Sequence, residues 1–150
     1  MQTVGCKLLE EDQMTQNENY KVLSETEELV LGHVFEDAYL TTKKSGETIS
    51  LGDFYGHPDC GLISRTNDWC IVCGPILVVW TKNNISRIEC ADLNRVFDIR
   101  QSGSYTVQLL IDPWAANSAI WECNITTKEK CKIRDFPDYK DKEYTDNVKW

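Results

Sequence analysis

Short runs of alternating apolar and polar residues make up most of this chain, and turn-forming residues separate the runs. Stretches enriched in β-branched and aromatic side chains recur every 8–14 residues along the sequence. This spacing predicts strands over residues 20–23, 61–64, 69–73, 76–81, 85–90, 95–100, 105–111, 119–125 and 130–134. Turn residues cluster at 66–68, 74–75, 82–84, 101–103 and 126–129. Closely spaced short strands are typical of an antiparallel all-β fold, a sandwich or barrel-like sheet with at most one short helix.

The segment 29–42 fits either a helix or a strand. Ser24 and Glu27 match a helix capping box, and several of the apolar residues that follow keep helical spacing. Valine, phenylalanine, tyrosine and threonine nevertheless dominate the segment, and residues 43–46 have the composition of a hairpin turn leading into 47–51. We therefore predict strand over 29–42.

The chain has the length and composition of one domain. It has 150 residues, of which 41% are hydrophobic and 27% charged, and no shift in composition divides it. We predict a single β-rich domain over 1–150, with 1–18 and 137–150 as peripheral or flexible ends. The first residues lack the pattern of a secretory signal, and the longest apolar run, 71–80, is too short to span a membrane. We therefore expect a cytoplasmic protein that contacts no membrane.

Acidic residues outnumber basic ones by 24 to 16, which gives a formal net charge of −8. Such a surface repels phosphate, so we expect no direct binding to nucleic acid. The first 50 residues carry ten of the acidic side chains and only four basic ones. They form either a solvated face or a surface that attracts a basic partner.

Seven cysteines raise the question of metal binding. His57, Cys60, Cys70 and Cys73 have the spacing of a Cys₃His zinc site. Residues 70–73 read as a strand, however, and positions 70 and 73 of a strand point to opposite faces. We therefore predict buried free thiols, no metal and no cofactor, and these four residues as the ligands if zinc is present. Cys123 and Cys131 flank a predicted turn, which would place them opposite each other across a hairpin.

The sequence carries no recognisable catalytic motif. It has no phosphate-binding loop, no dinucleotide fingerprint and no nucleophile elbow. His33 and His57 are its two histidines, and a Cys60–His57 pair is the nearest approach to an activated nucleophile. We predict that the protein is not an enzyme.

Three stretches, 51–63, 68–80 and 119–136, carry a family resemblance. Over residues 28–136 the chain resembles the small immunity proteins of bacterial polymorphic and contact-dependent toxin systems, which are short, acidic, β-rich and tolerant of cysteine. The resemblance implies a cytoplasmic inhibitor that binds a cognate toxin domain, commonly a nuclease, and occludes its active site. Because a nuclease must hold phosphate, this partner is expected to be basic.

Acidic residues in the predicted loops, together with aromatic residues near them, are the candidate contacts with that partner. They are Asp53, Tyr55, Asp59, Asp68, Asp135, Asp138 and Tyr139. The alternative function is a small β-sandwich module that binds a ligand or peptide through its five tryptophans and has no toxin partner.

Overall fold

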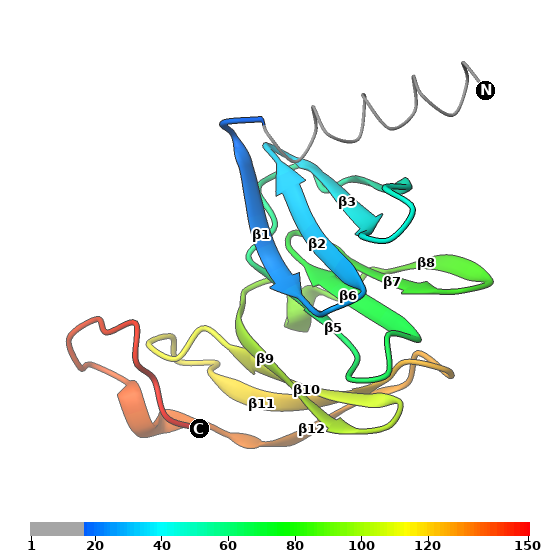
Figure 1. Ribbon diagram of the computed structural model, residues 1–150. Coiled ribbons are helices and arrows are strands. Elements are labelled where there is room, and N and C mark those ends of the chain that lie inside the picture. Colours follow the sequence, from blue (N-terminus) through cyan, green and yellow to red (C-terminus); the bar gives the residue numbers. More distant parts are fainter. Residues whose placement is uncertain (1–16) are drawn as a thin grey trace, which may run out of the picture.

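The computed structural model describes residues 17–150, and twelve strands in this range form three antiparallel sheets of four strands each (Figure 1). The first sheet contains β1 (Tyr20–Glu25), β2 (Leu29–Val34), β3 (Asp37–Thr42) and β4 (Thr48–Asp53). The middle sheet contains β5 (Cys60–Ile63), β6 (Trp69–Cys73), β7 (Leu77–Thr81) and β8 (Asn84–Ile88). The last sheet contains β9 (Val96–Gly103), β10 (Thr106–Ile111), β11 (Ala119–Asn124) and β12 (Lys130–Asp135). Single 3₁₀ turns occur at Ala91–Leu93 and Pro137–Tyr139. The all-β antiparallel prediction is confirmed.

Each sheet is a meander in which every strand pairs with its neighbour in sequence. The three sheets stack face to face, with the middle sheet between the other two (Figure 1). Their first strands, β1, β5 and β9, lie side by side. Consecutive four-stranded meanders stacked in this way resemble neighbouring blades of a β-propeller.

The first strands also run in the same direction. The Ser24 hydroxyl oxygen accepts a hydrogen bond from the Ile63 N–H (3.1 Å) on the side facing β5. On the other side, the Cys60 thiol contacts the Val96 carbonyl (3.8 Å) and the Arg65 N–H donates to the Gln101 side chain (3.0 Å). All loops therefore fall at one of two ends. We call the end with loops 35–36, 54–59, 89–95 and 112–118 the start end, and the end with loops 26–28, 43–47, 64–68 and 82–83 the far end.

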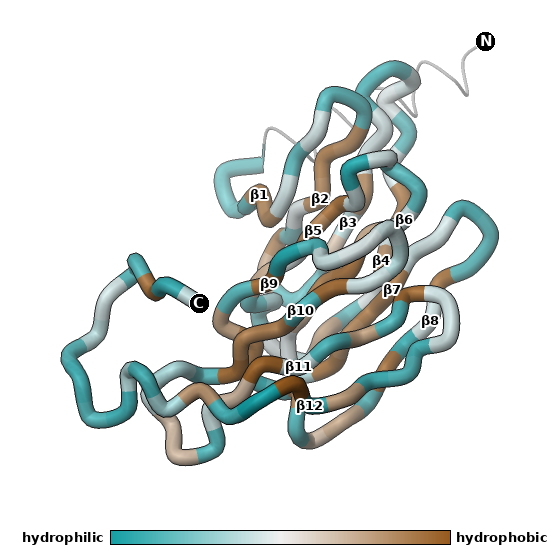
Figure 2. The backbone as a smooth tube through the Cα atoms, turned by 90° about the horizontal axis from the view of Figure 1, so that it is seen from below, coloured by the Kyte–Doolittle hydropathy of each residue, from teal (hydrophilic) through white to brown (hydrophobic). Residues whose placement is uncertain are grey.

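The centre of the middle sheet is buried on both faces, which explains the continuous apolar run of β6. Trp69, Ile71 and Cys73 pack toward the last sheet, whereas Cys70 and Val72 pack toward the first. All five side chains are buried. In Figure 2 the hydrophobic colour follows the strands of this stack, and the hydrophilic colour follows the turns and the C-terminal segment. The two cores between the sheets thus supply the apolar burial of the fold.

The C-terminal segment packs on the outer face of the last sheet. Leu110, Ile120 and Phe136 are buried there, and Tyr139 and Trp150 pack against them. The Trp150 indole N–H donates to Asp98 (3.0 Å), and the Arg100 guanidinium lies 4.0 Å from the centre of the Trp150 ring.

The strand prediction over 29–42 is confirmed, but the segment forms two strands, because Phe35 and Glu36 make a tight turn between β2 and β3. Two other local predictions are wrong. The predicted turn at 101–103 belongs to β9, and the chain turns at residues 104–105 instead. Cys131 lies opposite Glu122 and is exposed, whereas Cys123 is buried, so the two cysteines do not face each other.

Part of the N-terminal prediction concerns residues that the structure does not describe. Cys6, the acidic residues 10–12 and most of the predicted N-terminal peripheral segment lie outside the described range. Within residues 17–150 there is no helix long and apolar enough to cross a lipid bilayer.

Candidate functional site

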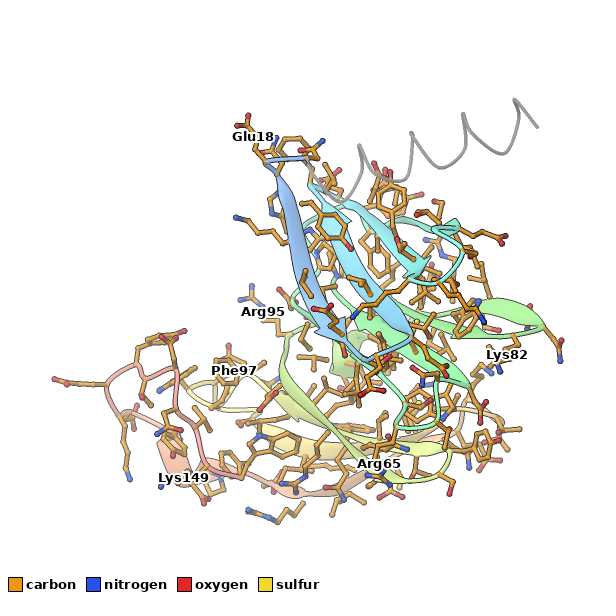
Figure 3. The ribbon with its side chains drawn as sticks, viewed as in Figure 1. Glu18, Arg65, Lys82, Arg95, Phe97 and Lys149 are labelled. Atoms are coloured by element: carbon orange, nitrogen blue, oxygen red, sulfur yellow. The ribbon has the colours of Figure 1, made fainter. Side chains whose placement is uncertain are left out.

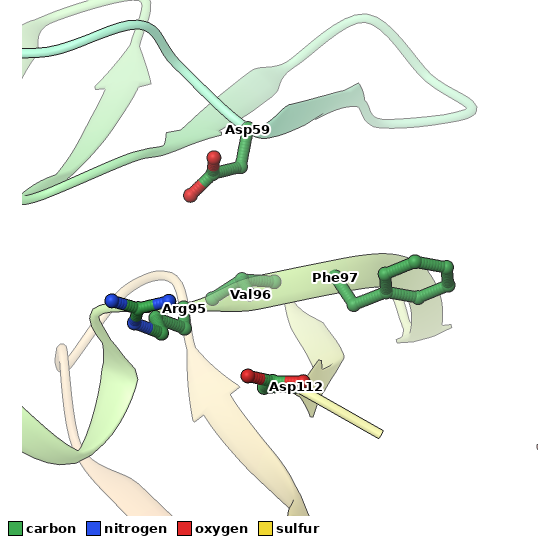
Figure 4. Close-up of a pocket in the computed structure, with 5 residues that line it drawn as sticks. All are labelled: Asp59, Arg95, Val96, Phe97 and Asp112. Atoms are coloured by element: carbon green, nitrogen blue, oxygen red, sulfur yellow. The ribbon is translucent and has the colours of Figure 1, made fainter. Parts of the chain in front are cut away.

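A cleft of about 320 Å³ opens at the start end, between the middle and last sheets. Asp59 directly precedes β5, Arg95 directly precedes β9, and Asp112 directly follows β10, so the parallel first strands bring these residues together. The Asp112 N–H donates to the Arg95 carbonyl (2.9 Å) and joins the two loops. Figure 4 shows Asp59 facing Arg95 and Asp112 across the cleft, with Val96 and Phe97 completing its lining.

The cleft contains two carboxylates and one guanidinium group, and no ion pair joins Arg95 to Asp59 or Asp112. Among residues 17–150, Arg95 forms no ion pair. Partial burial raises the pKa of the Asp59 carboxyl group, and the charge of Arg95 lowers it by a smaller amount. A second recess of about 410 Å³ shares Arg95 and Asp112 with this cleft and adds Asp92, Asn94 and Asn117. Such a site can bind charged side chains of a partner, since carboxylates accept from cations and a guanidinium donates to anions.

The buried thiol near the cleft, Cys73, is a poor nucleophile. Cys73 is fully buried, and its hydrogen bond with Cys60 together with burial raises the pKa of the Cys73 thiol well above its usual value. The Cys60 thiol lies against the Val96 carbonyl, and the His57 ring lies 5.9 Å from the His33 ring. The structure therefore does not join Cys60 and His57 as an activated pair.

Two exposed aromatic residues stand at the same end, on the loops that follow β2 and β4. Phe35 and Tyr55 are 56% and 70% exposed. Both have a left-handed backbone, with φ of 53° and 57°. An aromatic residue in this region is strained, and such strain is concentrated at functional sites. The Phe54 N–H donates to the Glu36 carbonyl (2.8 Å), which holds the two loops together.

Acidic side chains accompany these aromatic residues. Asp37 and Asp53 are cross-strand partners, and Glu36 is part of the turn beside them. All three are exposed, and within residues 17–150 none of them forms an ion pair. We call Phe35, Glu36, Asp37, Asp53 and Tyr55 the acidic–aromatic patch.

The predicted partner contacts fall into three groups. Asp53, Tyr55 and Asp59 all lie at the start end, the first two in the patch and Asp59 in the cleft. Asp135, Asp138 and Tyr139 lie at the same end of the last sheet but contact their own chain: Asp135 pairs with Lys132, Asp138 with Arg134 (3.9 Å), and the Tyr139 hydroxyl accepts from the Lys149 N–H (3.0 Å). Asp68 lies at the far end, 3.6 Å from the Lys82 ammonium.

The four alternative zinc ligands do not converge. Cys70 lies in the core between the first and middle sheets, and Cys73 lies in the core between the middle and last sheets. Within residues 17–150 there is no group of three or more metal-ligating side chains. One ion could not bind Cys70 and Cys73 together in this arrangement.

Sequence reasoning missed Phe35, Arg95 and Asp112. Phe35 lay inside a segment predicted as one strand, and the adjacent Glu36 and Asp37 were the signal for the turn. Arg95 and Asp112 have no local signal, because they meet Asp59 only through the stacking of the sheets. It also missed a cleft of about 600 Å³ at the far end, between the first and middle sheets, with Trp80 in its lining.

Comparison with known proteins shows a likeness in fold alone. No protein-family model matches the chain, and no curated protein matches it. A solved structure of Kuenenia stuttgartiensis hydrazine synthase matches with a TM-score of 0.54 and 11% sequence identity. The match covers 77% of this chain but 37% of the hydrazine synthase chain. At this identity it supports the stacked-sheet architecture and carries no information about activity.

Proposed function

We propose that this protein is a non-catalytic immunity protein that binds a basic toxin domain through its start end and occludes that domain's active site. The observation that carries the proposal is the acidic–aromatic patch, in which two exposed aromatic residues with left-handed backbones stand beside three acidic side chains that form no ion pair within residues 17–150. Exposed aromatic residues are frequent anchors of protein interfaces. The family resemblance of the sequence supplies the class of partner.

Electrostatics supports the choice of a basic partner. The protein has a net charge of −8, and Glu36, Asp37 and Asp53 add negative charge to the patch. The Arg87 guanidinium lies 5.8 Å from the centre of the Tyr55 ring and is the basic group beside it. Such an acidic surface attracts a phosphate-binding cleft of a nuclease and increases the rate of association at low salt. Asp59 and Asp112 lie at the same end and would accept from further basic side chains of the toxin.

The first experiment is co-expression with the reading frame immediately upstream of the gene. Its C-terminal domain is induced in a susceptible host with and without this protein. We expect the fragment to arrest growth and this protein to restore it. A fragment that is harmless, or that arrests growth regardless, refutes the immunity function.

The second experiment locates the interface on the protein itself. Tyr55→Ala should weaken toxin binding by about 2 kcal/mol or more, roughly thirtyfold in Kd. Asp53→Lys should slow association and reduce its salt dependence. Glu129→Lys makes the same change of charge at an exposed far-end turn and is the matched control. If the control weakens binding as much as Asp53→Lys, the start end is not the interface.

A further inference from the structure

The far end contains a cleft that the proposed inhibitory surface does not use. It has a volume of about 600 Å³ and lies between the first and middle sheets. Figure 3 shows Lys82, at this cleft, on the opposite side of the middle sheet from Arg95. Four turns and the strands beside them contribute the lining residues Glu27, Glu28, Leu29, Thr42, Lys44, Asn67, Trp80 and Lys82.

Trp80 supplies an aromatic surface to this cleft. Its side chain is partly buried and packs against the core between the first and middle sheets. Within residues 17–150 the indole N–H of Trp80 has no hydrogen-bond partner, and it is not among the polar atoms that are buried without one. By contrast, the Trp69 N–H donates to the Ser104 carbonyl (2.8 Å), and the Trp150 N–H donates to Asp98. Trp80 therefore keeps both a ring surface and a donor for a ligand.

Asn67 is held in place before any ligand binds. Its backbone is left-handed, with φ of 62°, and its N–H donates to the Ser64 carbonyl (3.0 Å). The Thr26 hydroxyl donates to the Asn67 side-chain oxygen (2.5 Å) and accepts from the Leu29 N–H (3.0 Å). The amide nitrogen of Asn67 has no partner in the described part of the chain. A preorganised donor of this kind lowers the entropic cost of binding a polar ligand.

The charged side chains around the cleft balance one another. Glu27 and Glu28 contribute two carboxylates, and Lys44 and Lys82 contribute two ammonium groups. No ion pair joins these four residues to each other. Lys82 also pairs with Asp68 (3.6 Å), which does not line the cleft. The lining therefore offers both donors and acceptors and carries little net charge, which suits a neutral ligand.

We propose that this cleft binds a neutral saccharide, with one face of a pyranose ring stacked on Trp80 and its hydroxyl groups bonded to Asn67 and the surrounding carboxylate and ammonium groups. A sugar ring combines an apolar C–H face with a perimeter of groups that both donate and accept. That combination matches an aromatic surface surrounded by polar side chains of both kinds. The volume is within the range of small-molecule sites. The proposal does not depend on the immunity function, because the residues involved lie at the other end of the molecule.

The test uses the full chain. Wild-type protein is screened on an array of neutral mono- and disaccharides, and the strongest of these is titrated by calorimetry and by tryptophan fluorescence. Trp80→Ala should lose at least tenfold in affinity, Trp80→Phe should lose less, and Asn67→Ala should weaken binding severalfold. Trp150→Phe is the matched control, since this tryptophan lies on the last sheet, and it should bind like the wild type. Circular dichroism and thermal unfolding confirm that each variant is folded.

Each outcome decides the proposal. Binding that falls with Trp80→Ala and Asn67→Ala but not with Trp150→Phe supports it. A wild-type protein that binds no neutral saccharide on the array refutes it, as does saccharide binding that is unchanged in both cleft variants. Binding of an apolar peptide library in the cleft, in place of any sugar, would also overturn it.

Discussion

Gly61 allows the first and middle sheets to approach closely, and its replacement by alanine should loosen their contact. A Cβ atom at this position would lie 2.8 Å from a methyl carbon of Leu31, 3.2 Å from the Ile71 carbonyl oxygen and 3.3 Å from the Leu23 Cβ. Leu31 is fully buried, so its side chain cannot move into solvent. Alanine would thus be forced into a filled space, with a backbone atom as one of its neighbours.

The expected loss of stability is modest and measurable. Overpacking of this kind costs about 1–3 kcal/mol. Replacing glycine by alanine returns about 0.4–1 kcal/mol by restricting the unfolded chain. The net loss should be about 1–2 kcal/mol, which corresponds to a decrease in Tm of roughly 2–8 °C for a chain of this length.

A double-mutant cycle tests the cause as well as the size of the effect. Urea unfolding at equilibrium gives the free energy of unfolding for the wild type, Gly61→Ala, Leu31→Val and the double variant. Because Leu31→Val removes the closest carbon, Gly61→Ala should cost at least about 0.5 kcal/mol less in that background. An unchanged or raised stability of Gly61→Ala refutes the packing argument, and so does an equal cost in both backgrounds.

Three further changes follow from buried or partly buried polar groups. Ser64→Ala should destabilise the protein by about 1–3 kcal/mol in urea unfolding, because the hydroxyl oxygen of the buried Ser64 accepts from the N–H of the buried Trp69 (3.2 Å). An unchanged unfolding midpoint would contradict this. Asp59 has a raised pKa in the folded state, so its protonated form is favoured there and stability declines as pH rises through that pKa. Asp59→Asn should therefore have a higher Tm than the wild type at pH 7, and this difference should vanish below pH 4; a lower Tm at pH 7 would contradict it. Burial raises the pKa of the Cys70 thiol to about 12, whereas Cys131 is exposed. Iodoacetamide should therefore label Cys131 long before Cys70, which mass spectrometry after brief treatment would detect.

The strands of this protein were readable from the sequence because each has a local signal. β6 is the clearest case: its five apolar residues form one uninterrupted run, and the structure buries all of them between two sheets. The turn at Phe35 was not predicted, because phenylalanine is unusual at a position with positive φ and does not mark a turn.

The candidate sites could be predicted only in part. Asp53 and Tyr55 stand out as an acid beside an aromatic residue in a loop, and both are exposed in the structure. The cleft of Asp59, Arg95 and Asp112 depends on the parallel alignment of strands that are far apart in sequence. No local pattern in the sequence encodes that alignment.

The position of β6 between two cores has a consequence for how the chain folds. Every strand pairs with its neighbour along the chain, so the hairpins depend on local contacts and have a low contact order, which favours rapid formation. Strand β6 of the middle meander, however, has no face that water can solvate favourably. Residues Trp69 and Ile71 on one side of β6, and Cys70 and Val72 on the other, lose their apolar cover if either outer sheet departs. The three meanders should therefore unfold together in a single cooperative transition rather than one after another.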